Sequence, residues 1–192
     1  MNVAAILLAA GSATRFGSDK LLHPLPHGVP IAVQAARNLK QAIGRVVAVL
    51  RPGAAQLQRL LEEEGVEVVS CERALEGMGA SLACAVRAAG AVDGYLVALA
   101  DMPFVRPSTI VAVRDALAAG APLAAPYFRA RRGHPVAIGA EYRRALEALE
   151  GDEGARRLFA ADPGKVAKIA VGDPGVLRDI DTPADLAPPV IV

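Results

Sequence analysis

Residues that could bind a chain of phosphates lie close to the amino terminus of the 192-residue sequence. Residues 3–10 are continuously apolar, which is typical of a central parallel strand covered on both faces. The following segment contains Gly11 and Gly17, which permit close approach of backbone N–H groups to an anion, and Arg15 and Lys20, which add positive charge. This combination predicts a polyphosphate-binding loop at the carboxyl end of the strand, where open α/β sheets bind ligands.

The spacing within this loop excludes two common phosphate-binding motifs. A P-loop ends in Gly-Lys-Ser/Thr, whereas Ser18 and Asp19 separate Gly17 from Lys20. The dinucleotide-binding fingerprint requires three glycines at fixed offsets, and the loop has no such triplet. The loop therefore belongs to another class of phosphate-binding motif.

A second candidate for chemistry is an acid at the end of another apolar run. Residues 95–100 predict a strand that ends in Asp101, and parallel strands place their carboxyl ends at one edge of a sheet. A carboxylate beside the loop suits Mg²⁺ or Mn²⁺, because hard cations bind carboxylate, phosphate and water oxygens. A strand-end aspartate can also be a turn or capping residue, but Pro103 and Pro107 disfavour a cap.

Asp179 and Asp181, close to the carboxyl terminus, are candidates for a second metal ligand. They occupy alternate positions of an extended segment, and we expect their side chains to point to opposite faces. At most one of these two carboxylates would then face the site, and we favour Asp181. Thr182 and Pro183 follow them and predict the start of a terminal helix.

Two more segments carry residues that could contact a ligand. Gly79 and Ser81 lie at the start of a helix expected to end near residue 89, where a hydroxyl or backbone N–H could meet a ligand oxygen, or where the glycine could serve only the turn. A dense basic cluster lies farther along the chain and consists of Arg129, Arg131 and Arg132. These arginines could bind an anionic second substrate, or they could form a solvated strand edge.

Composition restricts the class of protein. One domain is expected over residues 1–187, with a short tail at 188–192. The sequence is 53% hydrophobic and 4% aromatic, which favours an α/β core of aliphatic residues. A net charge of +1 argues against a large nucleic-acid interface, and the longest uncharged runs are shorter than the roughly 18 residues that span a membrane. Cys71 and Cys84 are too few for a disulfide framework, so we expect reduced thiols and a cytoplasmic location.

Strand and helix patterns alternate along the chain. Helices predicted over 31–43 and 54–64 separate the first three strands, which favours parallel pairing through right-handed crossovers. A helix over 141–150 and a short helix through residue 160, capped by Asp152, are expected after the basic cluster. The pattern predicts a single-domain, Rossmann-like, three-layer α/β/α fold with a mostly parallel central sheet. The other strands are expected at 46–50, 66–70, 123–127, 135–138 and 165–171.

Five motifs resemble those of the MobA-like nucleotidyltransferase superfamily, and most closely those of its MocA-like branch, the molybdenum cofactor cytidylyltransferases. They are LAAG-x-x-x-R-x-G-x-x-K from Leu8, GM-x-x-SL from Gly77, LADMP from Leu99, RGHPV from Arg132 and DIDTPADL from Asp179. Ala13 departs from the family pattern, in which serine is frequent at this position. The resemblance implies a nucleotidyltransferase fold.

The resemblance also implies roles for individual residues. His134 would lie on the acceptor side, as a positioning residue and not a general base. The catalytic residues would be Arg15, Lys20 and Asp101, and the metal ligands would be Asp101 and Asp181. Substrate contacts would come from Leu8, Ala9, Ala10, Gly11, Ser12, Gly17, Gly79, Ser81 and His134.

The reaction implied by the resemblance is transfer of CMP from CTP to the terminal phosphate of molybdenum-bearing molybdopterin, with Mg²⁺ as cofactor and pyrophosphate leaving. Ala10 favours CTP over GTP, because LAAG is similar to the cytidylyl branch and LAGG to the guanylyl branch. A molybdenum hydroxylase that receives the product is a further expected partner. A phosphate monoester is mostly dianionic at neutral pH, so this reaction needs no general base. Two alternatives remain open, namely transfer to a sugar phosphate or other small phosphate, and a non-catalytic molybdenum cofactor carrier.

Overall fold

Eight strands form one sheet in the computed structural model, which describes residues 1–11 and 19–186. Seven of them follow the order β3-β2-β1-β4-β7-β5-β6, and β8 pairs with β5. Strands β1 to β4 are mutually parallel and β8 is parallel to β5, whereas β7 is antiparallel to β4 and β5, and β6 is antiparallel to β5. The strands are β1 (Val3–Leu8), β2 (Val46–Leu50), β3 (Glu67–Ser70), β4 (Gly94–Leu99), β5 (Leu123–Phe128), β6 (Arg131–Arg132), β7 (Val136–Gly139) and β8 (Val166–Ala170).

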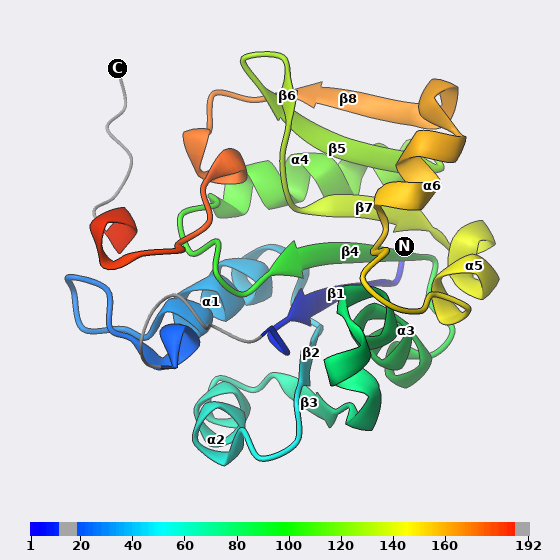
Figure 1. Ribbon diagram of the computed structural model, residues 1–192. Helices are drawn as coiled ribbons and strands as arrows, with labels where there is room; N and C mark the ends of the chain where they lie inside the picture. Colours follow the sequence, from blue (N-terminus) through cyan, green and yellow to red (C-terminus); the bar gives the residue numbers. More distant parts are fainter. Residues whose placement is uncertain (12–18, 187–192) are drawn as a thin grey trace.

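Helices cover both faces of this sheet and produce three layers (Figure 1). Buried side chains of α1, α2 and α4 belong to one core, and those of α3, α5 and α6 belong to the other. The α-helices of the described residues are α1 (Ile31–Ile43), α2 (Ala55–Glu63), α3 (Met78–Ala89), α4 (Pro107–Ala118), α5 (Arg143–Glu147) and α6 (Arg156–Ala161). None of them is long and apolar enough to cross a membrane. The predicted three-layer fold with a mostly parallel sheet is confirmed; the expected domain boundary at residue 187 lies outside the described residues.

The burial of β1 explains why the amino-terminal apolar run lacks polar alternation. Ala5 and Leu7 face one core and Ala4 and Ile6 face the other, and all four are fully buried. Strand β1 lies between β2 and β4, and Leu8 is in register with Leu99. The segments that follow β1 and β4 therefore leave the same edge of the sheet, side by side.

The region between β7 and β8 differs from the prediction. The helix expected over 141–150 is limited to α5, preceded by a 3-10 turn (Ala140–Tyr142), because residues 150–154 leave the helix and pack against the start of α3. The Gly79 N–H donates to the Gly151 carbonyl oxygen at 2.7 Å in this contact. Asp152 was expected to cap the next helix, but α6 begins after Ala155 and has no side-chain cap.

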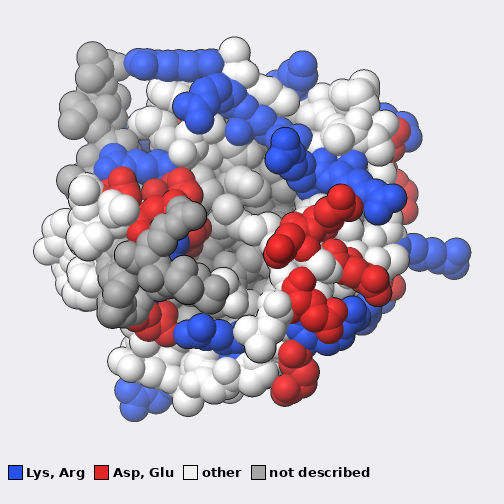
Figure 2. Space-filling model, viewed as in Figure 1, with Lys and Arg blue, Asp and Glu red and all other residues white. Residues whose placement is uncertain are grey.

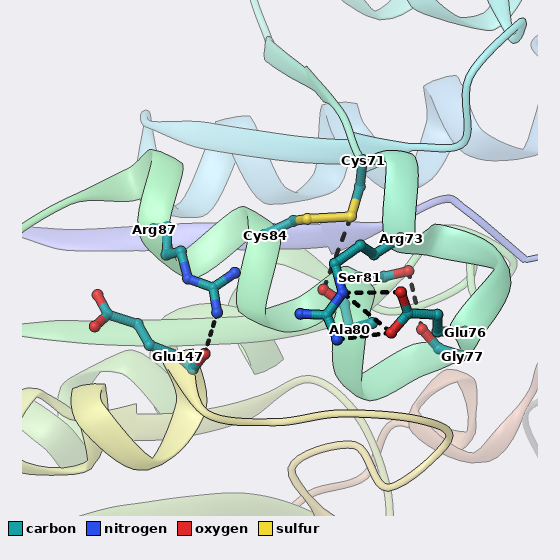
Figure 3. Close-up of a disulfide and its surroundings, with 9 residues drawn as sticks. All are labelled: Cys71, Arg73, Glu76, Gly77, Ala80, Ser81, Cys84, Arg87 and Glu147. Carbon is teal, nitrogen blue, oxygen red and sulfur yellow. Dashed lines mark hydrogen bonds and ion pairs between the residues drawn. A yellow bond between two sulfur atoms is a disulfide. The ribbon is translucent and has the colours of Figure 1, made fainter.

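The cysteines form a disulfide, so the expectation of two reduced thiols is wrong. Cys71 directly follows β3 and Cys84 lies on α3, with 13 residues of sequence separation and a Cα–Cα distance of 6.1 Å. The chain folds back between them through the 3-10 helix η2 (Glu72–Glu76), which returns it to the sheet and brings the two side chains together (Figure 3). Sequence spacing alone does not reveal this reversal of the chain.

Asp173 connects the start of α4 to the carboxyl-terminal segment. Its side chain is 2% exposed and accepts hydrogen bonds from the Arg106 N–H at 2.9 Å and the Thr109 hydroxyl at 2.8 Å. The carboxylate also accepts the Gly175 N–H at 3.0 Å, inside the 3-10 turn η5 (Pro174–Leu177). This buried carboxylate therefore fixes the origin of the segment that carries Asp179 and Asp181.

Replacing Asp173 by alanine is expected to lower the free energy of unfolding by about 3 kcal/mol, because three donors lose a charged, buried acceptor. Urea denaturation followed by circular dichroism measures this loss. Asp115→Ala is the matched control, since Asp115 bonds only to Arg114 at the surface among the described residues, and should have a much smaller effect. Equal losses in the two variants would contradict the structural role of Asp173.

Candidate active site

Three carboxylates meet at the carboxyl end of β4. Asp101 lies two residues after the end of this strand, and Asp179 and Asp181 come from the segment after η5. One oxygen of each carboxylate lies within 4.8 Å of the others. The Ile180 N–H donates to the Asp101 carbonyl oxygen at 2.9 Å, and the Ile180 side chain is 0% exposed. The tail segment is thus attached to the strand end by its backbone and by a buried side chain between the two acids.

The expectation that only Asp179 or Asp181 faces the site is wrong, because both carboxylates join Asp101. The physical reason is the two-residue period of extended chain, in which residues i and i+2 share a face. Ile180 occupies the opposite face and is buried, so its two neighbours point together toward Asp101.

Lys20 bridges this acidic cluster. Its Nζ donates to Asp101 Oδ2 at 3.0 Å and to Asp181 Oδ1 at 3.2 Å, and its side chain is 13% exposed. Burial alone lowers the pKa of Lys20, but the hydrogen bonds and Coulombic attraction of the two acids outweigh burial and raise this pKa above its usual value. Lys20 therefore stays charged, and with three carboxylates against one ammonium the cluster fits a divalent cation. Its all-oxygen donor set is the one that Mg²⁺ and Mn²⁺ prefer.

A cavity of about 380 Å³ lies beside the cluster, within the size range of small-molecule sites. Its floor is the end of β1, and its opposite wall is η2 with the first turns of α3. The lining residues are Leu8, Ala9, Ala10, Gly11, Lys20, Leu21, Ala74, Leu75, Gly77, Met78, Ser81, Leu99, Asp101 and Asp152. The structure therefore brings together most of the residues singled out in the sequence, and Arg15, Ser12 and Gly17 lie outside the described residues.

Two predicted substrate-binding residues on α3 differ in their surroundings. The Ser81 hydroxyl lines the cavity but donates to the Gly77 carbonyl oxygen at 3.2 Å. Gly79 does not line the cavity, and its N–H is bonded to Gly151. A Cβ at Gly79 would lie 2.7 Å from the Glu150 carbonyl oxygen, so close packing against residues 150–154 accounts for this glycine.

His134 does not line the cavity beside the cluster. Its backbone N–H donates to the Val176 carbonyl oxygen at 2.9 Å. The imidazole ring bonds to the Val97 carbonyl, while its Nδ1 atom is buried with no partner among the described residues. Burial lowers the pKa of His134 and outweighs the opposing effect of the Val97 hydrogen bond, so the ring is neutral at pH 7. This environment suits a positioning role and disfavours general base catalysis.

Asp152 is a cavity residue that the sequence reasoning missed. A Cβ built on Gly77 would lie 2.3 Å from Asp152 Oδ1, so the carboxylate lies directly over Gly77 at the cavity wall. Asp152 belongs to the sequence GDEGAR from Gly151 to Arg156, which was expected to provide a helix cap. The location becomes evident only from the packing of this loop on α3.

This chain belongs to the family of proteins with a MobA-like NTP transferase domain, whose model matches residues 5–166. The fold is thus that of a nucleotidyltransferase domain. Among its relatives, the bifunctional protein GlmU of Dinoroseobacter shibae is 36% identical over 200 residues, covering 97% of this chain and 37% of GlmU. The chain spans less than two-fifths of the GlmU proteins that it matches.

Two other relatives match along nearly their whole length. Purine catabolism protein PucB of Bacillus subtilis is 30% identical and nicotine blue oxidoreductase of Paenarthrobacter nicotinovorans is 31% identical, and each match covers 94% of this chain and 92% of the relative. The crystal structure of Rv0371c from Mycobacterium tuberculosis is 26% identical with a TM-score of 0.83, covering 96% of this chain and 94% of that chain. Rv0371c has also been solved in complex with manganese.

Replacing Asp179 by asparagine is expected to weaken Mn²⁺ binding at least about tenfold, as is the same change at Asp181, because each removes one charged oxygen donor. Isothermal titration with MnCl₂ measures the affinity. Asp115→Asn is the matched control, since the Asp115 carboxylate bonds to Arg114 at the surface and lies outside the cluster. Unchanged Mn²⁺ affinity in Asp179→Asn would remove this residue from the metal site.

Proposed function

We propose that the protein transfers CMP from CTP to the terminal phosphate of molybdenum-bearing molybdopterin and releases pyrophosphate. The observation that carries this proposal is the cluster of Asp101, Asp179 and Asp181, bridged by Lys20 at the edge of a nucleotide-sized cavity. The Lys20 ammonium supplies positive charge, and the three carboxylates can hold a divalent cation at the same point. Transfer between phosphates requires positive charge there. Residues 1–187 form the catalytic domain in this proposal.

The donor triphosphate lies in the cavity, against the end of β1. Ala9, Ala10 and Gly11 present backbone there, and Gly11 has no atom within 4 Å of where a Cβ would lie, so the space above it is open to a ligand. Lys20 places its ammonium beside the α-phosphate and the leaving pyrophosphate, with Arg15 as the second cation. Mg²⁺ held by Asp101 and Asp181, with Asp179, supplies charge neutralisation on the phosphate oxygens when bound.

The acceptor needs no deprotonation in this reaction. A phosphate monoester has a second pKa of about 6 and is already a nucleophile at neutral pH. Neutral His134 is consistent with this requirement, since its buried ring orients the segment on the acceptor side without transferring a proton. The role of this chain is therefore to position two anions in line and to offset their charge.

Arg129, Arg131 and Arg132 supply charge for the second anion. All three are exposed, on the hairpin between β5 and β6, and basic side chains form a band along that side of the face shown in Figure 2. Arg132 lies 5.0 Å from the centroid of the Phe159 ring, which holds its guanidinium in place without neutralising it. A guanidinium held in this way can bind an acceptor phosphate in bidentate geometry.

The cytidylyl and molybdopterin assignments rest on finer evidence. Ala10 lines the cavity and supports CTP by its resemblance to the LAAG motif. One relative is named as a purine catabolism protein and the other as an oxidoreductase. Both names are compatible with a protein that supplies a cofactor to a molybdenum hydroxylase. That hydroxylase is the proposed recipient of the product.

A second candidate function is transfer of a nucleotide to a sugar phosphate. The exposed arginines of the β5–β6 hairpin favour it equally, because guanidinium groups bind the phosphate of a sugar phosphate as readily as that of a pterin. Both candidates use the same donor site, and they differ in the acceptor that the basic hairpin side of the site accommodates.

Pyrophosphate release decides between these functions. The protein with MgCl₂, CTP and molybdenum-bearing molybdopterin is expected to release pyrophosphate, and N-acetylglucosamine 1-phosphate in place of the pterin is expected to give none. Asp101→Asn should be folded and inactive, because it loses the central charged ligand. Turnover with the sugar phosphate alone would establish the second candidate, and CTP binding without pyrophosphate release would indicate a carrier.

The same assay with GTP, ATP and UTP tests the base. CTP should give the highest kcat/KM, and Ala10→Gly, which creates the guanylyl-type motif, should reduce its advantage over GTP. Equal rates with all four nucleotides would contradict the cytidylyl assignment without affecting the transferase assignment.

Replacing Lys20 by glutamine is expected to change metal binding and turnover in opposite directions. Without the ammonium, the acids should bind Mn²⁺ more tightly, because a competing positive charge is removed. Turnover should fall about 10²-fold or more, because a donor to the transition-state charge is lost. Titration with MnCl₂ and pyrophosphate release measure the two effects, with Lys40→Gln as control because Lys40 bonds to the distant Gly65 carbonyl. Weaker Mn²⁺ binding in Lys20→Gln would contradict this competition.

A further inference from the structure

The Cys71–Cys84 disulfide joins the residue after β3 to α3 (Figure 3), and the segment between the two cysteines contributes to the cavity wall opposite β1. The chain that it closes into a ring contains η2 and the first two turns of α3. Five residues of this ring line the cavity, and these are Ala74, Leu75, Gly77, Met78 and Ser81. A covalent bond therefore closes the whole segment that forms this wall.

Few other interactions hold η2 in place. The Arg73 side chain bonds to Glu76 within η2 itself, at 2.7 to 3.0 Å, and its ion pair with Glu150 at 3.7 Å is exposed. Leu75 is 85% exposed, while Ala74 packs into the core. Among the described residues, no hydrogen bond joins Glu72–Glu76 to another helix or strand. The disulfide is thus a covalent tie across η2, in addition to the burial of Ala74 and the packing of Gly77 against Asp152.

The ring is also compatible with two free thiols. Cys71 Sγ lies 3.9 Å from the Ala80 carbonyl oxygen, which can accept a hydrogen bond from the Cys71 thiol once the disulfide is reduced. Cys71 is 1% exposed, whereas Cys84 is half-buried, so an attacking thiol reaches Cys84 more easily. The Cys71 sulfur therefore has a hydrogen-bond acceptor available in the reduced state.

We propose that Cys71 and Cys84 form a thiol–disulfide exchange site for low-molecular-weight thiols, and that its redox state controls the rigidity of the cavity wall. A thiolate bonds to the Cys84 sulfur, the Cys71–Cys84 bond breaks, and its electron pair leaves on Cys71, which takes up a proton. A second thiolate then attacks the sulfur of the first thiol and forms a symmetric disulfide with it. Cys84 leaves as a thiolate and takes up a proton. Two thiols are oxidised and the protein disulfide is reduced to two thiols.

The consequence for ligand binding rests on the proposed function, in which this wall contacts the nucleotide. With the disulfide intact, the wall is already ordered before the nucleotide binds. After reduction, binding must also order η2, which opposes association. We expect reduction to weaken Mg·CTP binding about fivefold, at the low end of ordinary coupling between sites. By linkage, Mg·CTP must make the disulfide harder to reduce by the same factor.

The test compares the oxidised and reduced full-length protein. Samples are equilibrated with oxidised or reduced dithiothreitol, and alkylation with mass spectrometry counts the free thiols. Hydrogen–deuterium exchange of peptides covering residues 72–83 then reports the rigidity of the wall, and isothermal titration reports Mg·CTP affinity. The double variant Cys71→Ser/Cys84→Ser is the matched control, and its exchange and affinity should resemble those of reduced protein and not respond to dithiothreitol.

Each outcome bears on the proposal separately from the proposed function. Faster exchange at 72–83 with weaker Mg·CTP binding after reduction would support it. Unchanged exchange and affinity in protein shown to be reduced would overturn it, as would free thiols that persist under the oxidised couple. Faster exchange in protein that binds no nucleotide in either state would support the exchange site and would contradict the nucleotidyltransferase assignment instead.

Discussion

The hydrogen bond from the Ile180 N–H to the Asp101 carbonyl oxygen is the interaction on which the site depends. It attaches a carboxyl-terminal segment with no strand of its own to the end of β4, and burial of the Ile180 side chain removes this segment's freedom to rotate. Asp179 and Asp181 are then directed to Asp101 together. Asp173 fixes the other end of the segment through its bonds to the start of α4. The acidic cluster is therefore a tertiary structure, assembled from residues about eighty positions apart in sequence.

The sequence predicted those features that depend on local pattern. The run over residues 3–10 is apolar because β1 is buried on both faces, and Asp101 lies beside it because parallel strands end at one edge. Features that depend on long-range packing were missed. The place of Asp152 depends on the loop that covers Gly77, and the Cys71–Cys84 bond depends on the reversal of the chain through η2. The pairing of Asp179 with Asp181 follows from strand periodicity, because residues i and i+2 of extended chain share one face and do not point to opposite faces.

Three neighbouring carboxylates are unfavourable unless their charge is compensated. Lys20 provides part of this compensation, with its pKa raised by the acids that it contacts. The compensation is incomplete, because one ammonium faces three carboxylates. Repulsion among the carboxylates makes the local stability of such a site lower than packing alone would give. A bound divalent cation or a cation–phosphate complex offsets this repulsion and raises the stability again. The affinity for such a ligand thus follows from the same electrostatics that make the isolated cluster unfavourable.

The two walls of the cavity are held in place by different interactions. One wall is the sheet edge, where Gly11 and Asp101 lie beyond the ends of two adjacent, hydrogen-bonded and largely buried strands. The opposite wall consists of η2 and the start of α3, positioned by a disulfide and by close packing of glycines against residues 150–154. Charged groups that must be placed to within a fraction of an ångström for phosphoryl transfer lie on the rigid side. The opposite wall can then move without displacing the carboxylates of the cluster, since no hydrogen bond among the described residues connects η2 to Asp101.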